Sequence, residues 1–370
     1  MLQTERSLKV DNLFVSALNN NVFPGASFGF SKWHNGMYSR ETNFYGYAQL
    51  DPEKKELQKD SVFDLASLTK VLSTVPLLLN LLDSNKINLE TELQTIFSSC
   101  PSDKATITIA QLLCHRSGLA AHRDFFTALL QLPPKKRKKS LLTMILEDDL
   151  VSTPGESCCY SDLGFILLGF IIEKIHGTNL AQLAEELLYK PLDLSEDLFY
   201  PALSTRNNPE YVSTERCPWT RKMLCGKVHD DNCRAMGGVA GHAGLFGTLY
   251  GALSMCEHFL DQWQGRGQHP SYSNKSLQRI LKPIENSGWT LGFDMVSETD
   301  SSAGHYFSRG SVGHLGFTGT SFWIDPIQDC IVVLLTNRVH PTRENWKIKN
   351  FRPIFHDTVM EKLKSQQKDF

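Results

Sequence analysis

The first clear hydrophobic pattern along the chain is that of an amphipathic helix near the N-terminus. Apolar side chains recur there with the i, i+3, i+4, i+7, i+8 spacing of one helical face, at Val10, Leu13, Phe14, Ala17 and Leu18. The stretch between residues 351 and 363, close to the other end, is also typical of a helix. The two ends of the chain are therefore each predicted to contribute one helix.

Candidate strands lie next to both of these helices. Residues 25–33 and 37–45 are strand-like runs separated by a turn that contains Asn35 and Gly36. An Asn-Gly pair favours a tight hairpin because both positions tolerate positive φ. Residues 321–324 and 330–335 are strand-like as well, and the loop between them predicts a second hairpin.

From Asp64 to about residue 286 the pattern is mostly helical. The helix candidates are residues 107–113, 141–150, 163–175, 180–188 and 249–259. We therefore expect one domain split by another. Residues 1–63 and 287–370 would form a discontinuous α/β sheet domain, residues 64–286 a mostly helical domain, and the active site would lie in the cleft between them.

Composition narrows the classes of function. The chain has 370 residues, 41% of them hydrophobic, and a formal net charge of −2, so we expect a globular protein with a small-molecule substrate and no nucleic-acid partner. The most apolar run, residues 71–82, is too short to span a bilayer, and the N-terminus lacks a secretion signal. Nine cysteines, an odd number, favour a reducing compartment, which predicts a cytoplasmic protein. Nothing in the sequence indicates an oligomeric state.

The candidate chemistry begins at Ser67, Leu68, Thr69 and Lys70. Residues three apart are neighbours on a helix, so the Lys70 amine would reach the Ser67 hydroxyl and act as its base. We expect Asp64 to cap this helix, which places Ser67 in the first turn and its backbone N–H in an oxyanion hole. Lys70 must be neutral to accept a proton, and burial is expected to lower its pKa. The same pattern recurs at residues 365–368, in a polar tail that offers no partners.

A second candidate element is the turn that presents Tyr160 and Asp162 at the start of an apolar helix. The Tyr160 phenol can relay the Ser67 proton to a leaving group beside Lys70. A tyrosine that only packs at a helix start, with Asp162 as the cap, is the structural alternative.

The third element is the glycine-rich stretch 313–321, which leads into a strand. Its glycines allow a substrate backbone to approach closely, and the N–H of Phe317 would be the second oxyanion donor. His314, Gly316 and Thr318 are the expected substrate-binding residues of this stretch, and Asp162 of the preceding element is expected to bind substrate with them. A plain turn before a strand is the alternative.

Other polar and aromatic residues allow a functional and a structural interpretation. His229, Asp230 and His242 match no standard zinc spacing, so we expect them to line the cleft and predict no metal. His115 is expected to hydrogen-bond backbone beneath the cleft. Three further sets of residues each have two possible roles. Anion contacts or surface ion pairs are possible for Arg338, His340 and Arg343. An acyl pocket or plain core packing is possible for Trp289, Phe293 and Phe322, and an anion patch or a solvated loop for residues 133–139.

Taken together, the chain resembles the serine β-lactamase and penicillin-binding-protein superfamily, in particular its class C-like and esterase-like members. Residues 67–70 match the Ser-x-x-Lys motif, residues 160–162 resemble Tyr-x-Asn, and residues 314–316 stand where members carry Lys-Thr-Gly or His-x-Gly. Three further stretches are similar to the family: residues 112–119, 236–246 and 323–326. The resemblance covers roughly residues 20–345.

The resemblance implies an α+β fold of the β-lactamase/transpeptidase type, with an antiparallel sheet flanked by N- and C-terminal helices and an inserted all-helical domain. It also implies a serine hydrolase that forms an acyl-enzyme, with Ser67, Lys70 and Tyr160 as catalytic residues and no cofactor. Two departures matter. Asp162 replaces an amide donor, which weakens a β-lactamase assignment, and His314 replaces a permanent cation, so that carboxylate binding is expected to weaken from pH 6 to pH 8.

The expected substrate is a carboxylic ester or a D-amino-acid or muropeptide-type amide. A β-lactamase or penicillin-binding DD-peptidase is the first alternative. The second is a non-catalytic protein of the same fold that binds a muropeptide or acts as a scaffold. Fold resemblance alone does not choose among these substrates.

Overall fold

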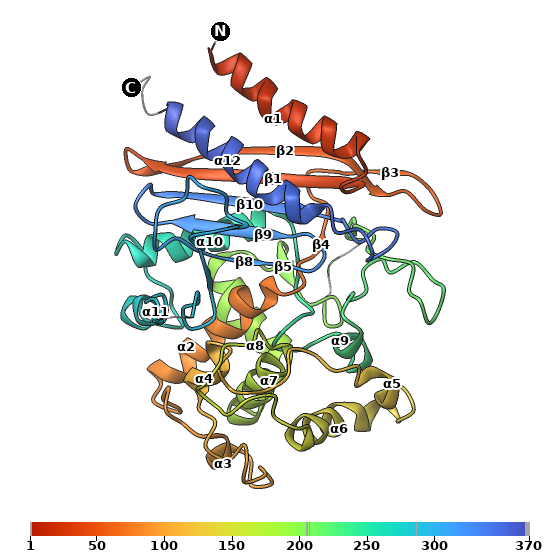
Figure 1. Ribbon diagram of the computed structural model, residues 1–370, viewed down its shortest axis with the longest axis vertical. Coiled ribbons are helices and arrows are strands. Elements are labelled where there is room, and N and C mark those ends of the chain that lie inside the picture. Colours follow the sequence, from red (N-terminus) through yellow and green to blue (C-terminus); the bar gives the residue numbers. More distant parts are fainter. Residues whose placement is uncertain (1, 205, 207, 286, 367–370) are drawn as a thin grey trace.

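A seven-stranded antiparallel sheet forms the centre of the molecule, in the spatial order β3-β2-β1-β10-β9-β8-β7 (Figure 1). The structure is a computed structural model that describes residues 2–204, 206, 208–285 and 287–366. The strands of this sheet are β1 (Gly25–His34), β2 (Met37–Gln49), β3 (Lys55–Glu56), β7 (Asp294–Met295), β8 (Val312–Leu315), β9 (Ser321–Asp325) and β10 (Cys330–Thr336). A smaller sheet has the order β4-β6-β5, with β4 (Phe63–Asp64), β5 (Leu198–Phe199) and β6 (Phe246–Gly247).

Both predicted hairpins are confirmed. In the first, His34 pairs with Met37, and Asn35 and Gly36 between them have φ values of 50° and 85°. In the second, Cys330 pairs with Asp325. β1 and β10 then pair along their length, from Ala26 opposite Thr336 to Lys32 opposite Cys330, so the two ends of the chain share one sheet.

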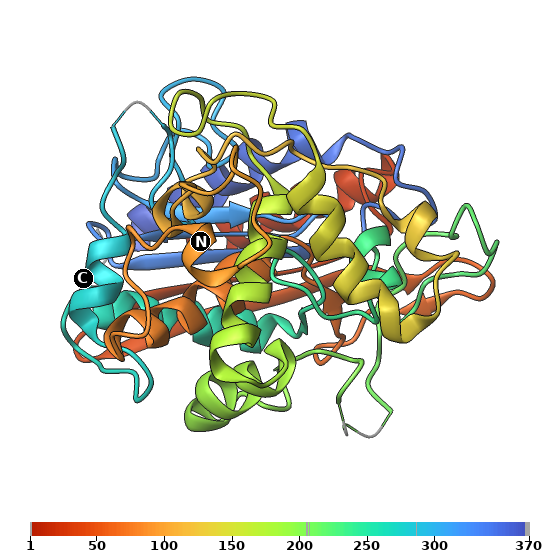
Figure 2. The same ribbon diagram turned by 90° about the horizontal axis from the view of Figure 1, so that it is seen from below.

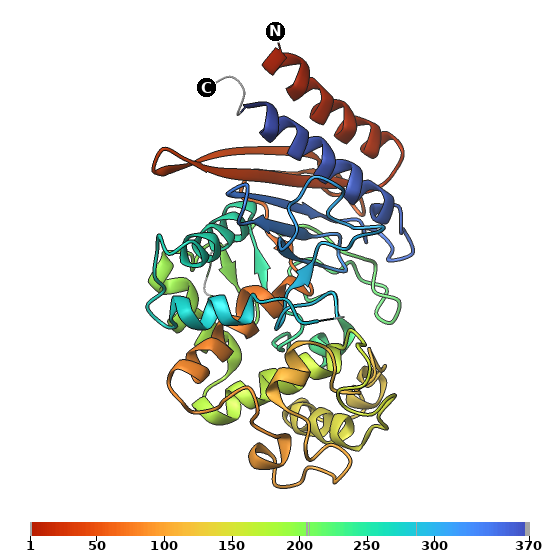
Figure 3. The same ribbon diagram turned by 60° about the vertical axis from the view of Figure 1, so that its left-hand side comes forward.

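Two helices from the ends of the chain, α1 (Leu2–Asn19) and α12 (Ile348–Gln366), lie side by side on one face of the sheet (Figures 1 and 3). The period-2 alternation of β10 explains how both faces are covered. Val332 and Leu334 join the core beneath α1 and α12, whereas Ile331, Val333 and Leu335 join the core on the opposite face. Of the second Ser-x-x-Lys match, Gln367 and Lys368 lie outside the described residues.

The helices from the middle of the chain lie on the opposite side of the sheet, which Figure 2 shows from below, and α10 (Leu249–Trp263) packs directly on β1 and β10. These helices are α2 (Val75–Asp83), α3 (Leu93–Ile96), α4 (Ile109–Leu113), α5 (Phe126–Leu129), α6 (Pro134–Glu147), α7 (Asp162–His176), α8 (Leu180–Ala184), α9 (Asp231–Ala235), α10 (Leu249–Trp263) and α11 (Asn274–Ile280). Two π-helical turns, η1 (Lys70–Thr74) and η2 (Glu185–Tyr189), and a 3₁₀ turn, η3 (Lys190–Leu192), complete this part. Residues 134–139, which include most of the basic run, belong to α6 and do not form a loop.

The α+β fold class is thus confirmed, whereas the domain boundaries stay a prediction. α10 lies within the segment 64–286, yet it packs directly on β1 and β10. The expected boundary near residue 286 lies outside the described residues. Among the helices that the structure describes, no single one is long and apolar enough to cross a membrane, although the bent pair formed by residues 162–176 and 180–192 passes that test by length and composition.

Candidate active site

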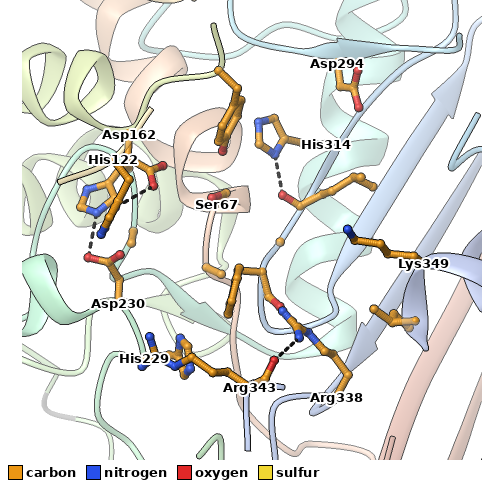
Figure 4. A pocket seen from close by; sticks show the side chains of 18 of the residues that line it. Ser67, His122, Asp162, His229, Asp230, Asp294, His314, Arg338, Arg343 and Lys349 are labelled. Carbon is orange, nitrogen blue, oxygen red and sulfur yellow. Dashed lines mark hydrogen bonds and ion pairs between the residues drawn. The ribbon is translucent and has the colours of Figure 1, made fainter. Parts of the chain in front are cut away.

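Ser67 lies at the wall of a cavity of about 630 Å³ that is lined by residues from the middle and from the C-terminal part of the chain (Figure 4). It stands in the tight turn between β4 and the first helical residues, directly after Ala66, whose φ of 48° is in the left-handed region. The Asp64 carboxylate accepts hydrogen bonds from the N–H groups of Ala66 and His229. Asp64 therefore fixes this turn against the loop of His229, and the expectation that it caps a helix containing Ser67 was wrong.

Lys70 follows one turn later and directs its amine at Ser67. Its Nζ lies 3.0 Å from Ser67 Oγ, 2.7 Å from Asp162 Oδ1 and 3.2 Å from the His242 carbonyl oxygen. The side chain is fully buried, and burial alone would lower the pKa of Lys70. Burial is the largest single influence, but the interactions with Asp162 and Tyr160 together outweigh it and raise that pKa above its usual value, so the expected depression of the Lys70 pKa was wrong.

Tyr160 reaches the same pair from the loop that precedes α7. Its phenol forms hydrogen-bonding interactions with Lys70 and Ser67, and its ring lies 4.9 Å from Lys70 Nζ. Burial raises the pKa of this phenol, which therefore stays protonated near neutral pH. The ring packs between His115 and Trp289, at centroid distances of 4.6 and 5.6 Å.

His115 has the structural role that the sequence predicts. Its Nδ1 accepts a hydrogen bond of 3.1 Å from the Ser161 N–H, beneath the Tyr160 ring. Ser161 is also the residue that caps α7, since its Oγ accepts from the Gly164 N–H. Asp162 is accordingly the first residue of α7 and not its cap.

The two expected oxyanion donors, the N–H groups of Ser67 and Phe317, both border the cavity. Neither N–H is hydrogen-bonded to another group within the described part of the chain. Gly316, just before Phe317, closes the turn between β8 and β9 through its N–H to the Thr320 carbonyl, 2.7 Å. A Cβ at Gly316 would come within 1.9 Å of Thr320 Oγ1, so only glycine fits there.

The residues of this turn that were expected to bind substrate differ in their position relative to the cavity. Gly316 and His314 line the cavity, but Thr318 does not, because its buried hydroxyl donates to the Asp64 carbonyl at 2.8 Å. The assignment of Thr318 to substrate binding was therefore wrong. His314 is buried, its Nδ1–H donates to the Leu315 carbonyl, and burial together with Lys70 lowers its pKa to about 3. His314 is thus neutral at pH 6 as well as at pH 8, and the expected pH-dependent carboxylate contact does not follow.

The charged residues that line the cavity fall into two main groups. His122, Asp162 and Asp230 lie on one side of Ser67, where Asp124 contacts His122 and His242 contacts Asp230. Arg338 and Lys349 lie on the other side, the basic side, and Arg352 joins them because it binds the Gly316 carbonyl next to the Phe317 carbonyl that Arg338 binds. Asp294 is a carboxylate outside the first group. Arg343 is paired with Glu215 and Asp231, as the ion-pair alternative predicts, and His340 lies outside the cavity.

The other two arginines of the cavity, Arg338 and Arg352, bind backbone carbonyl groups. Arg338 donates to the Phe317 carbonyl at 2.7 Å, and Arg352 donates to the Gly316 and Thr320 carbonyls at 2.9 and 2.8 Å. Neither forms an ion pair with any residue that the structure describes, and burial lowers the pKa of Arg338 to about 10 and that of Arg352 to about 9. Both still carry their charge at neutral pH.

One group of residues has the composition of a metal site. His122, Asp162 and Asp230 each bring a ligand atom to within 4.8 Å of the others. One oxygen of each carboxylate is already engaged, however, since Asp162 Oδ1 pairs with Lys70, and Asp230 Oδ1 accepts from the Cys233 N–H and contacts His242 Nε2 at 2.9 Å. The composition of this group alone does not assign a metal to it.

The sequence interpretation missed several residues of the cavity. His122, Asp294, Lys349 and Arg352 line it, and no motif marks any of them. Burial raises the pKa of Asp294 to about 7. Of the three aromatic residues considered as an acyl pocket, Trp289 lines the cavity, whereas Phe293 and Phe322 belong to the core.

Comparisons with known proteins agree with this geometry. Residues 10–349 match the family described as Beta-lactamase. A protein of Salmonella typhi named "Putative D-alanyl-D-alanine carboxypeptidase" is 30% identical over 319 residues, which cover 78% of this chain and 72% of that protein.

Solved structures share the fold. The octameric penicillin-binding protein homologue from Pyrococcus abyssi has a TM-score of 0.73 at 15% identity, over 95% of this chain and 77% of its own. EstCE1, a hydrolase with promiscuous acyltransferase activity, has a TM-score of 0.72 at 17% identity, over 95% of this chain and 99% of its own.

Proposed function

The chain belongs to the β-lactamase family of serine hydrolases, and from that premise we propose that it cleaves its substrate through an acyl-enzyme formed on Ser67. The observation that carries the proposal is the 3.0 Å contact between Ser67 Oγ and Lys70 Nζ at the wall of the cavity. A hydroxyl with an adjacent amine is an activated nucleophile. Tyr160 stands against both groups, as a proton relay requires.

In the proposed reaction Ser67 Oγ attacks the substrate carbonyl carbon while its proton passes to the Lys70 and Tyr160 pair. The carbonyl oxygen becomes an oxyanion that accepts from the N–H groups of Ser67 and Phe317. The pair then protonates the leaving group, and the acyl-enzyme remains. A water molecule repeats these steps on the acyl carbon and frees Ser67.

For the substrate we propose an amide whose leaving group is a D-amino acid with a free carboxylate. The carboxylate would lie on the basic side of the cavity, where Arg338 and Arg352 have no carboxylate partner among the described residues and Lys349 is exposed. The relative from Salmonella typhi is named as a carboxypeptidase of this type. An ester is the second candidate, because the aromatic rings of Trp289, Phe317 and Trp346 line the cavity and suit an apolar acyl group.

We also propose that the protein works in the cytoplasm. All nine cysteines are free, and Cys158 and Cys225 are exposed. Exposed thiols persist in a reducing compartment.

Covalent labelling tests the nucleophile. We expect one fluorophosphonate to attach to the wild-type protein, observed as an added mass on the intact chain, and no attachment to Ser67→Ala. Ser365→Ala, which removes the serine of the other Ser-x-x-Lys match, is the matched control and should label like wild type. An unlabelled wild-type protein that also fails to turn over p-nitrophenyl esters would point to a binding protein instead.

A substrate series tests the carboxylate contact. Peptides ending in D-Ala-D-Ala should be cleaved with a lower KM than the same peptides with an amidated C-terminus, and a chromogenic cephalosporin should be a poor substrate. Lys349→Ala should raise KM for the free carboxylate about 5-fold, the effect of about 1 kcal/mol for an exposed ion pair, and leave KM for the amidated peptide unchanged. Equal effects on both peptides would place the carboxylate elsewhere.

A further inference from the structure

The amine that is expected to accept the Ser67 proton is itself held by a carboxylate. Lys70 Nζ lies closer to Asp162 Oδ1, at 2.7 Å, than to Ser67 Oγ, at 3.0 Å. Lys70 is fully buried, whereas 21% of the Asp162 side chain is exposed to the cavity. Opposite charges at this distance favour both charged forms, so the pair rests as ammonium and carboxylate. An ammonium group has no lone pair and cannot take a proton from Ser67.

The other groups near Ser67 do not offer a resting base either. The Tyr160 phenol is protonated. The imidazoles of His115 and His314 use Nδ1 for backbone hydrogen bonds, and neither ring is bonded to Ser67 or Lys70 within the described residues. A free amine must therefore be generated on Lys70 itself, and the group in contact with its Nζ that can accept a proton is the Asp162 carboxylate.

We propose that Asp162 is a positioning residue that takes a proton from Lys70 once substrate fills the cavity, so that Ser67, Lys70 and Asp162 act as one proton chain. The proposal rests on the acyl-enzyme function proposed above. Substrate would displace the water that reaches the exposed edge of Asp162. Loss of water penalises an ion pair more than it penalises a neutral amine beside a neutral acid, so filling the cavity favours transfer.

No reactant other than the substrate and the attacking water takes part in these steps. An N–H bond of the Lys70 ammonium breaks and an O–H bond forms on Asp162 Oδ1, which leaves a neutral amine and a neutral acid. Ser67 Oγ then bonds to the carbonyl carbon while its proton moves to Lys70 Nζ. When the leaving group departs it takes a proton from Lys70, directly or through Tyr160. After deacylation the proton on Asp162 returns to Lys70.

The proposed role of Asp162 requires a carboxylate and not an amide. An amide at this position, as in the Tyr-x-Asn motif that residues 160–162 resemble, can neither hold the ammonium form of Lys70 by charge nor accept its proton. The carboxylate does both. A binding contact to the substrate is therefore not its main expected role, because one carboxylate oxygen contacts Lys70 and the other faces His122.

Several titratable groups face the ion pair and will affect its pH dependence. They come from five segments of the chain and are His115, His122, Tyr160, Asp230, His242 and His314. His122 lies directly beside Asp162, with Nδ1 at 3.6 Å from Oδ2 and 41% of its side chain exposed, and its hydrogen bond to Asp162 raises the pKa of His122. A protonated His122 stabilises the Asp162 carboxylate and opposes the transfer, so His122→Gln should be the background for the test.

The test is the pH dependence of the rate at which a fluorophosphonate labels Ser67. In His122→Gln the proton moves only between Lys70 and Asp162, so the number of protons bound to the protein stays constant. The labelling rate should therefore change less than about 2-fold over roughly pH 6 to 9. In His122→Gln with Asp162→Asn, Lys70 must lose its proton to solvent. The rate should then rise about 10-fold per pH unit until the pKa of the buried lysine is passed. Equal profiles for the two proteins would overturn the proposal.

Two further variants separate charge from structure. Asp162→Glu restores a carboxylate and should restore the flat profile. Asp230→Asn removes a carboxylate that lies at the same side of the cavity but does not contact Lys70, and it should also keep the flat profile. A sloping profile for Asp162→Glu in a protein with an unchanged unfolding temperature would contradict the role of the carboxylate.

A direct titration keeps this inference distinct from the proposed function. If Ser67 of the wild type does not label at all, the acyl-enzyme proposal fails. NMR of ¹⁵N-labelled lysine then reports the Lys70 amine without any turnover. We expect Lys70 to lose its proton at a lower pH in Asp162→Asn than in wild type, because burial then acts without the carboxylate. An unchanged titration would show that Asp162 does not control the Lys70 proton.

Discussion

His314 shows how a single buried residue changes the chemistry that its motif suggests. It stands on β8 where the family carries a Lys-Thr-Gly lysine, but its ring is buried and its Nε2 has no hydrogen-bond partner within the described chain. Burial lowers the pKa of His314 to about 3, so the ring holds no positive charge near neutral pH. The permanent cations of the cavity are instead the arginine and lysine side chains on its basic side.

This gives a prediction for the binding of carboxylate substrates. In Asp294→Asn, KM for a peptide with a free C-terminal carboxylate should change less than about 2-fold between pH 6 and pH 8, because Arg338 and Arg352, with pKa values of about 10 and about 9, keep their charge throughout. The substitution removes a cavity carboxyl whose pKa of about 7 lies inside this range. Steady-state kinetics at both pH values measure it, with the amidated peptide as the control. A KM that rises about 10-fold for the free carboxylate alone would show that His314 is protonated at pH 6.

At the scale of an element, α7 positions Asp162 by packing closely on the loop that carries His242. A Cβ at Gly169 would lie 2.8 Å from the Gly241 nitrogen, so helix and loop are in backbone contact. The loop in turn accepts hydrogen bonds from Thr74 Oγ1 at the Gly241 carbonyl and from Lys70 Nζ at the His242 carbonyl. The position of the Lys70 amine therefore depends on how closely α7 approaches this loop.

Two alanine substitutions on α7 test this dependence. Gly169→Ala should lower the free energy of unfolding by about 1 to 3 kcal/mol, the usual cost of overpacking, and should slow fluorophosphonate labelling of Ser67. Gly164→Ala is the matched control on the same helix, because its Cβ would meet its nearest neighbours, in Leu112 and Ser161, at ordinary contact distances of 3.6 to 3.8 Å. The control should gain about 0.5 to 1 kcal/mol, since alanine favours a helix over glycine. Urea unfolding measures both, and a loss in Gly164→Ala equal to that in Gly169→Ala would contradict the contact argument.

The elements that the sequence predicts are those fixed by local patterns. The hairpin at Asn35 and Gly36 and the amphipathic face of α1 follow from spacing and turn chemistry alone. The turn at Ser67 does not, because Ala66 adopts a left-handed conformation that no local preference of alanine explains. It is held by the hydrogen bonds of Asp64 to Ala66 and to His229, which is 165 positions away along the chain. Contacts of that kind are not encoded in a local pattern.

At the scale of the whole molecule, the division of the cavity into an acidic and a basic side arises from segments that meet only in the folded chain. His122, Asp162 and Asp230 come from three separate loops and helix starts, and Arg338 and Arg352 come from the C-terminal part. The sequence predicts the nucleophile and its neighbours because their spacing within each motif is short. It does not predict which charges share the cavity, since that depends on packing between distant segments.

The same burial makes the stability of the folded chain sensitive to acid. Burial lowers the pKa of His269 to about 4, that of His314 to about 3 and that of His356 to about 4, all below the value of about 6.5 in an unfolded chain. The unfolded chain therefore binds these protons at a higher pH than the folded one. The contribution of these histidines to the free energy of unfolding is complete above pH 6.5 and is lost progressively as the pH falls towards 4. Glu215 and Asp230, each with a pKa lowered to about 2, extend the loss to lower pH.

His356 allows this prediction to be tested at one position. It belongs to α12, its ring is fully buried, and its Nδ1–H donates to the Ser302 carbonyl at 2.7 Å. Between pH 7 and pH 5 the wild type should lose free energy of unfolding, and His356→Gln should reduce that loss by on the order of 2 kcal/mol, because a group that binds a proton only when unfolded has been removed. Urea unfolding at both pH values measures the difference.

His305→Gln is the control for this prediction. His305 is exposed and Asp357 raises its pKa, so the removal of His305 should not reduce the loss of free energy of unfolding. A loss that is the same in His356→Gln as in wild type would mean that the buried imidazole already takes up its proton in the folded chain.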